Sequence, residues 1–149
     1  MLVLGSLPGE RSLREQRYYA HPANQFWRLL GRAIDVDLDA LDYADRLVHL
    51  AERRIALWDV VATARRDGSL DGSLRAVEAN PLRDYVRTHV ALRCIGFNGK
   101  TAARIGRRAL GALAEIDLID LPSSSPAYTI PFAQKYPAWA RVGDFASRA

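Results

Sequence analysis

Two stretches of the chain combine polar, small and aromatic side chains, although they lie far apart in the sequence. The first contains GSLPG at residues 5–9 and YYAHPANQFW at residues 18–27, and the second is LPSSSPAY at residues 121–128. Amide, imidazole and hydroxyl groups can hold a water molecule or a phosphate oxygen, and aromatic rings can stack on a planar ligand. Together these residue types are suited to a ligand-binding site.

Apolar runs precede both stretches and are expected to position them. Met1–Leu4 leads into the first stretch and Ile116–Leu121 leads into the second, and each run is typical of a buried strand. In an open α/β sheet, the loops at the carboxyl ends of parallel strands line the ligand crevice. The two stretches are therefore expected to converge on one site.

Further strands are predicted at Ile55–Val61 and Leu92–Phe97, and residues 62–73 read as a polar loop. Helices are predicted at Ser12–Arg17, after Asn24, at Leu41–Glu52, after Pro81, at Lys100–Leu110 and at Trp139–Ser147. Strands that alternate with helices predict the α/β class, as a three-layer α/β/α sandwich with a four-stranded, mainly parallel sheet. The length of 149 residues suits a single domain, residues 1–149. The abrupt first strand indicates either that the N-terminus is truncated or that the start was set late.

The composition indicates an ordinary globular protein with a modest excess of positive charge. The net charge is +4, and 19 of the 21 basic residues are arginine, which binds phosphate in a bidentate manner. This charge fits a nucleic-acid partner, although a GC-rich genome would equally explain the arginine excess. No apolar run is long enough to span a membrane, and the N-terminus lacks the layout of a signal peptide.

Several other motifs can be set aside. Gly99-Lys100-Thr101 resembles the end of a phosphate-binding loop, but the earlier glycine that this motif requires is Cys94 here. Cys94 is the single cysteine, which excludes an internal disulfide and a four-cysteine metal or iron–sulfur site. A zinc deaminase is excluded because its paired-cysteine signature is missing.

The two stretches resemble motifs 1 and 2 of the uracil-DNA glycosylase superfamily. The YYAHPANQFW segment is most similar to the hypoxanthine-DNA (deoxyinosine) glycosylase group, which is related to the mismatch-specific uracil/thymine-DNA glycosylases. Segments 55–60, 68–71 and 97–99 resemble further landmarks in the family's order. The resemblance implies a monofunctional DNA glycosylase that flips a deaminated base out of DNA, hypoxanthine first and uracil second. Water would then attack the N-glycosidic bond, without a metal or other cofactor.

By this resemblance, Asn24 is the expected catalytic residue and His21 the second candidate. Many members of the superfamily hold the attacking water with a residue of motif 1, but that position is Leu7 here. Asn24 matches the asparagine of the HPxNxFW segment in the hypoxanthine group. The alternatives are that Asn24 only caps the following helix, and that His21 contacts a phosphate or simply packs.

The residues expected to bind the base are Ser6, Leu7, Tyr19, Asp59 and Asn98. Tyr19 would stack on the extruded base, and Asp59 would accept a hydrogen bond from its Watson–Crick edge. Each has a structural alternative: Tyr19 could be a half-buried core residue, and Asp59 could pair with an arginine. Asn98 could cap the next helix instead of lining the pocket, and the cap is the stronger expectation.

The residues expected to contact DNA phosphates are Ser123, Ser124 and Ser125, and the alternative is an ordinary loop. Tyr128 stands where the family has asparagine, and it could probe the duplex or fill the gap that the base leaves. Lys100 and Lys135 are the only lysines, and neither lies in the two stretches. An enzyme that also cuts the strand generally needs an amine, so base release without strand cleavage is expected.

The partner implied is double-stranded DNA with a deaminated or mismatched base, with single-stranded DNA left open. No membrane partner is expected, and the protein is expected to be a monomer located in a bacterial-type cytoplasm with the nucleoid. Two rival functions stay open. Leu7 and Tyr128 would also suit a catalytically silent DNA-binding module, and the same fold could serve a hydrolase of free nucleosides or nucleotides.

Overall fold

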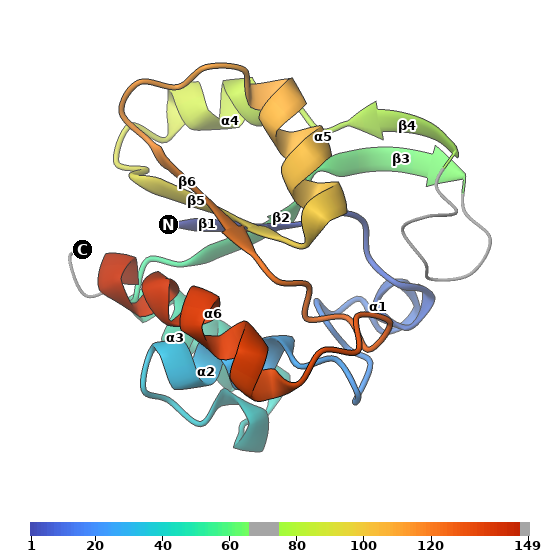
Figure 1. Ribbon diagram of the computed structural model, residues 1–149, viewed down its shortest axis with the longest axis vertical. Coiled ribbons are helices and arrows are strands. Elements are labelled where there is room, and N and C mark those ends of the chain that lie inside the picture. The colour runs from blue at the N-terminus through green and yellow to red at the C-terminus, as the bar shows by residue number, and fades with distance from the viewer. Residues whose placement is uncertain (66–74, 147–149) are drawn as a thin grey trace.

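Four short strands form the central sheet in the computed structural model of the protein, which describes residues 1–65 and 75–146 (Figure 1). The strands are β1 (Leu2–Gly5), β2 (Ala56–Asp59), β5 (Cys94–Asn98) and β6 (Asp117–Leu121). Their order is β2-β1-β5-β6, and every neighbouring pair is parallel. β1 and β5 are buried along their whole length, which explains why their sequences are continuous apolar runs and not alternating ones.

Helices cover both faces of the sheet, so the predicted α/β/α sandwich is confirmed (Figure 1). One layer contains α2 (Phe26–Ala33), the short 3-10 helix η1 (Leu38–Ala40), α3 (Tyr43–Glu52) and α6 (Phe132–Ala146). The other contains α4 (Leu82–Thr88) and α5 (Lys100–Leu110), and α1 (Glu10–Glu15) follows the loop after β1. Val3 packs in the first core, whereas Leu2 and Leu4 pack in the second, because successive side chains of a strand point to opposite faces.

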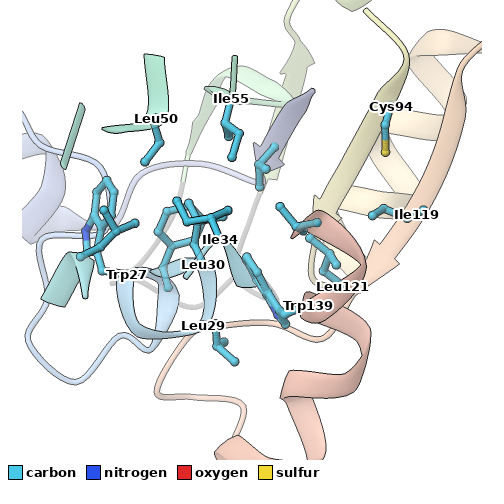
Figure 2. Close-up of a cluster of buried hydrophobic side chains, with 14 residues drawn as sticks. Trp27, Leu29, Leu30, Ile34, Leu50, Ile55, Cys94, Ile119, Leu121 and Trp139 are labelled. Atoms are coloured by element: carbon cyan, nitrogen blue, oxygen red, sulfur yellow. The ribbon is translucent and has the colours of Figure 1, made fainter. Parts of the chain in front are cut away.

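The core beneath α2 and α6 also anchors the loops that carry the polar residues (Figure 2). The ring of Phe26 meets Trp27 and Trp139 edge-on, at centroid distances of 5.1 and 5.6 Å. The indole N–H of Trp27 donates to the carbonyl oxygen of Tyr18 at 3.3 Å, and that of Trp139 donates to Pro122 at 2.9 Å. Each buried tryptophan therefore satisfies its one donor by fixing the backbone of a functional loop.

A hairpin corrects the prediction for the segment after β2. The expected strand Ile55–Val61 ends at Asp59, and β3 (Val61–Arg65) begins a second sheet by pairing antiparallel with β4 (Arg75–Ala79). Two register shifts interrupt this pairing, so the sequence lacks the regular alternation that reveals a hairpin. The remainder of the expected loop, and the landmark at 68–71, lie outside the described residues.

The last helix is longer than predicted. α6 begins at Phe132, well before the expected start at Trp139, and contains Pro137. A proline inside a helix removes a hydrogen bond, so the sequence favoured a start after it. The other predicted elements are present with ends shifted by a few residues. None of the helices within the described ranges is long and apolar enough to cross a membrane.

Candidate active site

A pocket of about 310 Å³ opens at the carboxyl ends of β1, β2 and β5, where the two polar stretches meet. The parallel register places these strand ends side by side, as expected for an α/β crevice. The pocket is lined by residues of both stretches, of the strand ends and of α1: Gly5, Ser6, Leu7, Pro8, Gly9, Arg11, Ser12, Tyr18, Tyr19, His21, Asn24, Asp59, Asn98, Ser123, Ser124, Ser125, Pro126, Ala127 and Tyr128. Every predicted site residue is therefore in this lining.

At one wall, the absence of a side chain at Gly5 brings two polar groups together. A Cβ atom at this position would lie 2.6 Å from Oδ1 of Asp59 and 3.0 Å from the hydroxyl of Tyr19. Asp59 is buried at the end of β2, and its backbone carbonyl accepts a hydrogen bond from Nδ2 of Asn80 at 2.8 Å. A carboxylate and a phenol hydroxyl thus lie near one another beside the pocket.

Tyr19 is supported from behind by the core. Its ring stacks on Phe26 with a centroid distance of 3.6 Å and an angle of 12° between the planes. Its backbone adopts φ 52°, a left-handed conformation that costs free energy for a residue with a side chain. The turn and the stack together fix the ring in the pocket wall.

Tyr18 was expected to pack, and it does so while also lining the pocket. Its backbone N–H donates to the hydroxyl of Tyr43 at 3.0 Å. Burial raises the pKa of Tyr18 to about 12, and the negative charge of Asp59 and the nearby Tyr43 add to this rise. Tyr18 therefore stays protonated in the neutral range and can act only as a neutral hydroxyl.

Asn24 is half-buried in the pocket wall just before α2. Its Oδ1 accepts a hydrogen bond from the backbone N–H of Phe26 at 3.0 Å, so the expected contact with the helix start is present. The formal N-cap position is Gln25, one residue later than the sequence suggested. Since a carbonyl oxygen has two lone pairs, this contact occupies only part of the capacity of Oδ1.

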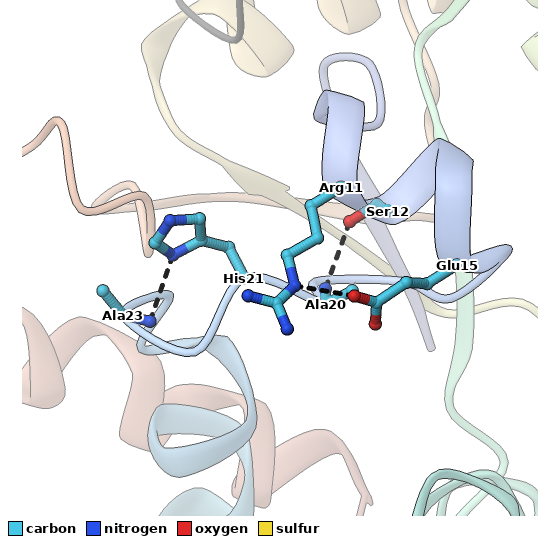
Figure 3. Close-up of polar contacts among 6 residues, drawn as sticks. All are labelled: Arg11, Ser12, Glu15, Ala20, His21 and Ala23. Carbon is cyan, nitrogen blue, oxygen red and sulfur yellow. Dashed lines mark hydrogen bonds and ion pairs between the residues drawn. The ribbon is translucent and has the colours of Figure 1, made fainter.

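His21 lines the pocket and is exposed, and Figure 3 shows its ring beside Ala23. Its Nδ1 lies 3.1 Å from the backbone N of Ala23 and accepts its N–H. A neutral imidazole that accepts at Nδ1 carries its proton on Nε2, which is then a donor. The sequence identified this residue, but the tautomer follows only from the turn.

The sequence analysis missed Arg11 and Ser12, which come from α1 and also line the pocket (Figure 3). Nε of Arg11 forms an ion pair with Oε1 of Glu15 at 2.7 Å, and Oγ of Ser12 accepts from the N–H of Ala20 at 3.1 Å. The second contact ties α1 to the turn before His21. Neither residue belongs to the recognised motifs, so the sequence held no signal for them.

Asn98 and Ser124 form a buried brace between β5 and the second loop. Nδ2 of Asn98 donates to Oγ of Ser124 at 2.8 Å, and Oδ1 accepts from the N–H of Ser124 at 2.9 Å. The expectation that Asn98 caps α5 is wrong, because Gly99 occupies the N-cap and no side chain bonds there. Ser124 is 0% exposed, so its hydroxyl cannot reach a phosphate, and this part of the DNA-binding prediction is corrected.

The other two serines shape the loop from within. Oγ of Ser123 accepts from the N–H of Ser125 at 3.2 Å, and Oγ of Ser125 accepts from the N–H of Ala127 at 3.2 Å. The carbonyl oxygen of Ser124 accepts from the N–H of Gln25 at 3.0 Å, which joins the two functional stretches directly. The loop is thus held in one conformation at the rim of the pocket.

An open α/β sheet with a polar, aromatic-lined pocket at its strand ends is typical of proteins that bind a ligand in that crevice. Residues 1–142 match the model of the uracil DNA glycosylase superfamily, and the chain belongs to this family. The family and fold expected from the sequence are therefore confirmed.

Two relatives carry the same description, "Hypoxanthine DNA glycosylase". The one from Methanosarcina barkeri is 37% identical over 144 residues, which cover 95% of this chain and 89% of the relative. The one from Methanosarcina acetivorans is 40% identical over 127 residues, which cover 85% and 79%. A solution NMR structure from M. acetivorans, provisionally described as a uracil DNA glycosylase, superimposes with a TM-score of 0.84 at 36% identity, covering 98% of this chain and 89% of that one.

These similarities identify the chain as a DNA glycosylase, a hydrolase of N-glycosyl bonds that acts on DNA. The expected enzyme class is thereby confirmed. The individual roles predicted for the pocket residues remain predictions, apart from the structural roles of Asn98 and Ser124.

Proposed function

We propose that the protein is a monofunctional glycosylase that removes hypoxanthine from DNA, with uracil as the second substrate. The observation that carries this proposal is that both motif stretches meet in one pocket. The descriptions of the two Methanosarcina relatives support hypoxanthine as the base. The nucleotide would rotate out of the duplex, because the bond to be broken is inaccessible inside the helix.

The carboxylate of Asp59 and the hydroxyl of Tyr19 suit the Watson–Crick edge of hypoxanthine. That edge presents an N–H donor beside a carbonyl acceptor, and uracil presents the same pair. Asp59 would accept from the N–H, and Tyr19 would donate to the carbonyl. Adenine reverses the pattern and would set its ring nitrogen, which is an acceptor, against the carboxylate of Asp59. The pair therefore discriminates a deaminated base from its parent.

Tyr19 would also replace the stacking that the base loses on leaving the duplex. Phe26 supports its ring from behind, and the ring lines the pocket in which the base would stack. A preformed aromatic surface of this kind contributes roughly 1–3 kcal/mol per stacked base.

Asn24 would hold the attacking water. Its Oδ1 is oriented by the N–H of Phe26 and has a second lone pair for an O–H of water. The bond from C1′ to the base breaks, its electron pair leaves with the base, and the water oxygen bonds to C1′ while its proton passes to the base. Leu7, which lines the same pocket, cannot take part in this step. Most of the acceleration would come from positioning and from stabilising the positive charge on the sugar.

The rim would hold the DNA backbone on both sides of the extruded nucleotide. Ser123 and Ser125 of the second stretch line the pocket, together with His21 of the first stretch and Arg11 of α1. Small side chains and backbone N–H groups allow close approach of a phosphate, and Arg11 adds a fixed positive charge. Such contacts position the enzyme without reading sequence.

The proposal is tested by single-turnover incubation with duplexes that each carry one inosine, uracil, xanthine or mismatched thymine. We expect abasic sites from inosine fastest and from uracil second, with the strand left intact. Free inosine is the matched control for the rival nucleoside hydrolase, and it should not be cleaved. DNA binding without base release from any duplex would instead establish the silent DNA-binding module.

A further inference from the structure

Lys135 is a buried charge that the proposed reaction does not use. Its side chain is 1% exposed, although it lies in the first turns of α6. Burial lowers the pKa of its ammonium group, because removing a charge from water costs free energy. Its Nζ donates to the carbonyl oxygen of Tyr128 at 2.8 Å and lies 5.3 Å from the centroid of the Tyr128 ring.

The contact is one half of a two-point attachment of the second loop to α6. Lys135 and Trp139 are four residues apart, so they lie on the same side of the helix. Trp139 donates to the carbonyl of Pro122 at the start of the loop, and Lys135 donates to that of Tyr128 at its end. Trp139 is fully buried and packs on Phe26, so a rigid helix holds both ends of the loop.

What this attachment positions is an aromatic ring at the rim of the pocket. Tyr128 is 40% exposed and lines the pocket. Its backbone N–H donates to the carbonyl oxygen of Ser125 at 3.0 Å, and its own carbonyl oxygen accepts from Lys135. Both polar groups of its backbone are therefore held in place. An exposed aromatic ring held in this way presents a flat face beside the site.

We propose that Lys135 is a positioning residue that fixes Tyr128, so that its ring stacks on a nucleobase of the bound DNA beside the extruded nucleotide. This inference rests on DNA as the substrate, but not on which base is removed. The ring would fill space that the extruded base vacates, and its energetic contribution would be that of aromatic–base stacking.

A second chemistry for the amine is disfavoured by the same geometry. A lysine that cleaves the abasic strand must attack C1′ of the sugar with its lone pair and release water to form a Schiff base. Lys135 is enclosed and donates to a carbonyl oxygen, and its Nζ is not part of the pocket lining. Lys135 is therefore placed to hold the backbone of Tyr128 and not to attack the sugar.

The experiment is a double-mutant cycle on a duplex that carries a stable abasic analogue. Tyr128→Ala should raise Kd about five- to hundred-fold, the loss of one stacked base, whereas Tyr128→Phe should retain wild-type affinity. Lys135→Met should raise Kd by a similar factor. In a protein that already carries Tyr128→Ala, adding Lys135→Met should raise Kd by less than about two-fold, because the two residues act as one unit.

Arg141→Met is the matched control. It removes one positive charge from the exposed side of α6, near Cys94 at the opposite ends of the strands, and should leave Kd within about two-fold. Urea unfolding checks that each variant is folded. If Lys135→Met does not fold, Lys135→Gln replaces it in the double-mutant cycle. Single-turnover rates at saturating enzyme should change less than Kd for Lys135→Met.

Additive losses from Lys135→Met and Tyr128→Ala would overturn the inference, as would wild-type Kd in the lysine variant. Borohydride trapping of a covalent complex that disappears in Lys135→Met would also overturn it, by making the amine a nucleophile. Failure of the proposed function gives a different pattern, in which wild-type protein releases no base while the coupling between Lys135 and Tyr128 in binding persists.

Discussion

Tyr19 combines two constraints in one residue. Its ring stacks on Phe26, and its hydroxyl, together with Oδ1 of Asp59, leaves no room for a side chain at Gly5. The left-handed backbone at Tyr19 shows that the turn is fitted to this placement at some cost in free energy. A ring that is fixed before the ligand arrives loses little conformational entropy on binding.

Replacement of Tyr19 by alanine should weaken binding to an extruded base by about 1–3 kcal/mol, since one stacked pair is lost. Affinity for undamaged duplex should barely change, because the ring does not touch the backbone of paired DNA in the proposed complex. Fluorescence anisotropy on matched damaged and undamaged duplexes measures both affinities. Tyr19→Phe keeps the ring and loses only the hydroxyl, so it should lose less affinity than Tyr19→Ala for the damaged duplex. Equal losses on both duplexes would remove Tyr19 from base binding.

At the scale of elements, the brace between Asn98 and Ser124 links the end of β5 to the second loop. Its two hydrogen bonds are buried, and they lie where the loop leaves β6 and passes the pocket. The carbonyl of Ser124 then continues the connection to Gln25 before α2. The conformation of the first stretch is therefore coupled to that of the second.

Asn98→Ala should lower the free energy of unfolding by about 1–3 kcal/mol, because the N–H of Ser124 is left buried without its acceptor. The concentration of DNA at half-saturation should rise more than the single-turnover rate falls, since the loop positions the backbone. Urea unfolding and base-release kinetics measure the two effects. Ser124→Ala removes only the hydroxyl contact and should be milder. An Asn98→Ala variant with wild-type stability and wild-type half-saturation would contradict the brace.

The elements also show what the sequence could and could not predict. Apolar runs identified all four strands of the main sheet, because buried parallel strands need no polar alternation. The sequence did not predict the hairpin β3–β4, because register shifts interrupt its alternating pattern. It also predicted too late a start for α6, because a proline such as Pro137 is rarely found inside a helix. Motif residues were located correctly, yet the partnership of Asn98 with Ser124 depends on a contact between distant segments that local patterns do not encode.

At the scale of the whole molecule, the two cores contain groups whose burial makes stability depend on pH. Cys94 lies in the sheet and is 0% exposed, and burial, aided by the nearby Asp117, raises its pKa from 9.0 to about 12. Burial likewise raises the pKa of Tyr18 from 10.0 to about 12. In both cases the unfolded chain ionises first, so the stabilisation is complete below the unfolded pKa and is lost as pH rises toward the folded one.

The free energy of unfolding should therefore fall from pH 9.0 upward, first through Cys94 and then through Tyr18. Cys94→Ala removes the first contribution, so the difference between wild type and variant should shrink by about 1 kcal/mol between about pH 8 and about pH 10. Urea unfolding across this range measures it. Parallel curves for the two proteins would show that the thiol titrates alike in both states.

The central claim is that the pocket joining the two stretches releases the base, with water held by Asn24. The most direct test is the single-turnover rate at which free hypoxanthine appears from a duplex with one inosine, at saturating enzyme. Asn24→Ala should lower this rate about 10²-fold or more, while DNA affinity is retained. Loss of the contact with Phe26 should also lower stability by about 1 kcal/mol, which Asn24→Asp, with its acceptor kept, should restore. An Asn24→Ala enzyme that releases hypoxanthine at the wild-type rate per folded molecule would contradict the account.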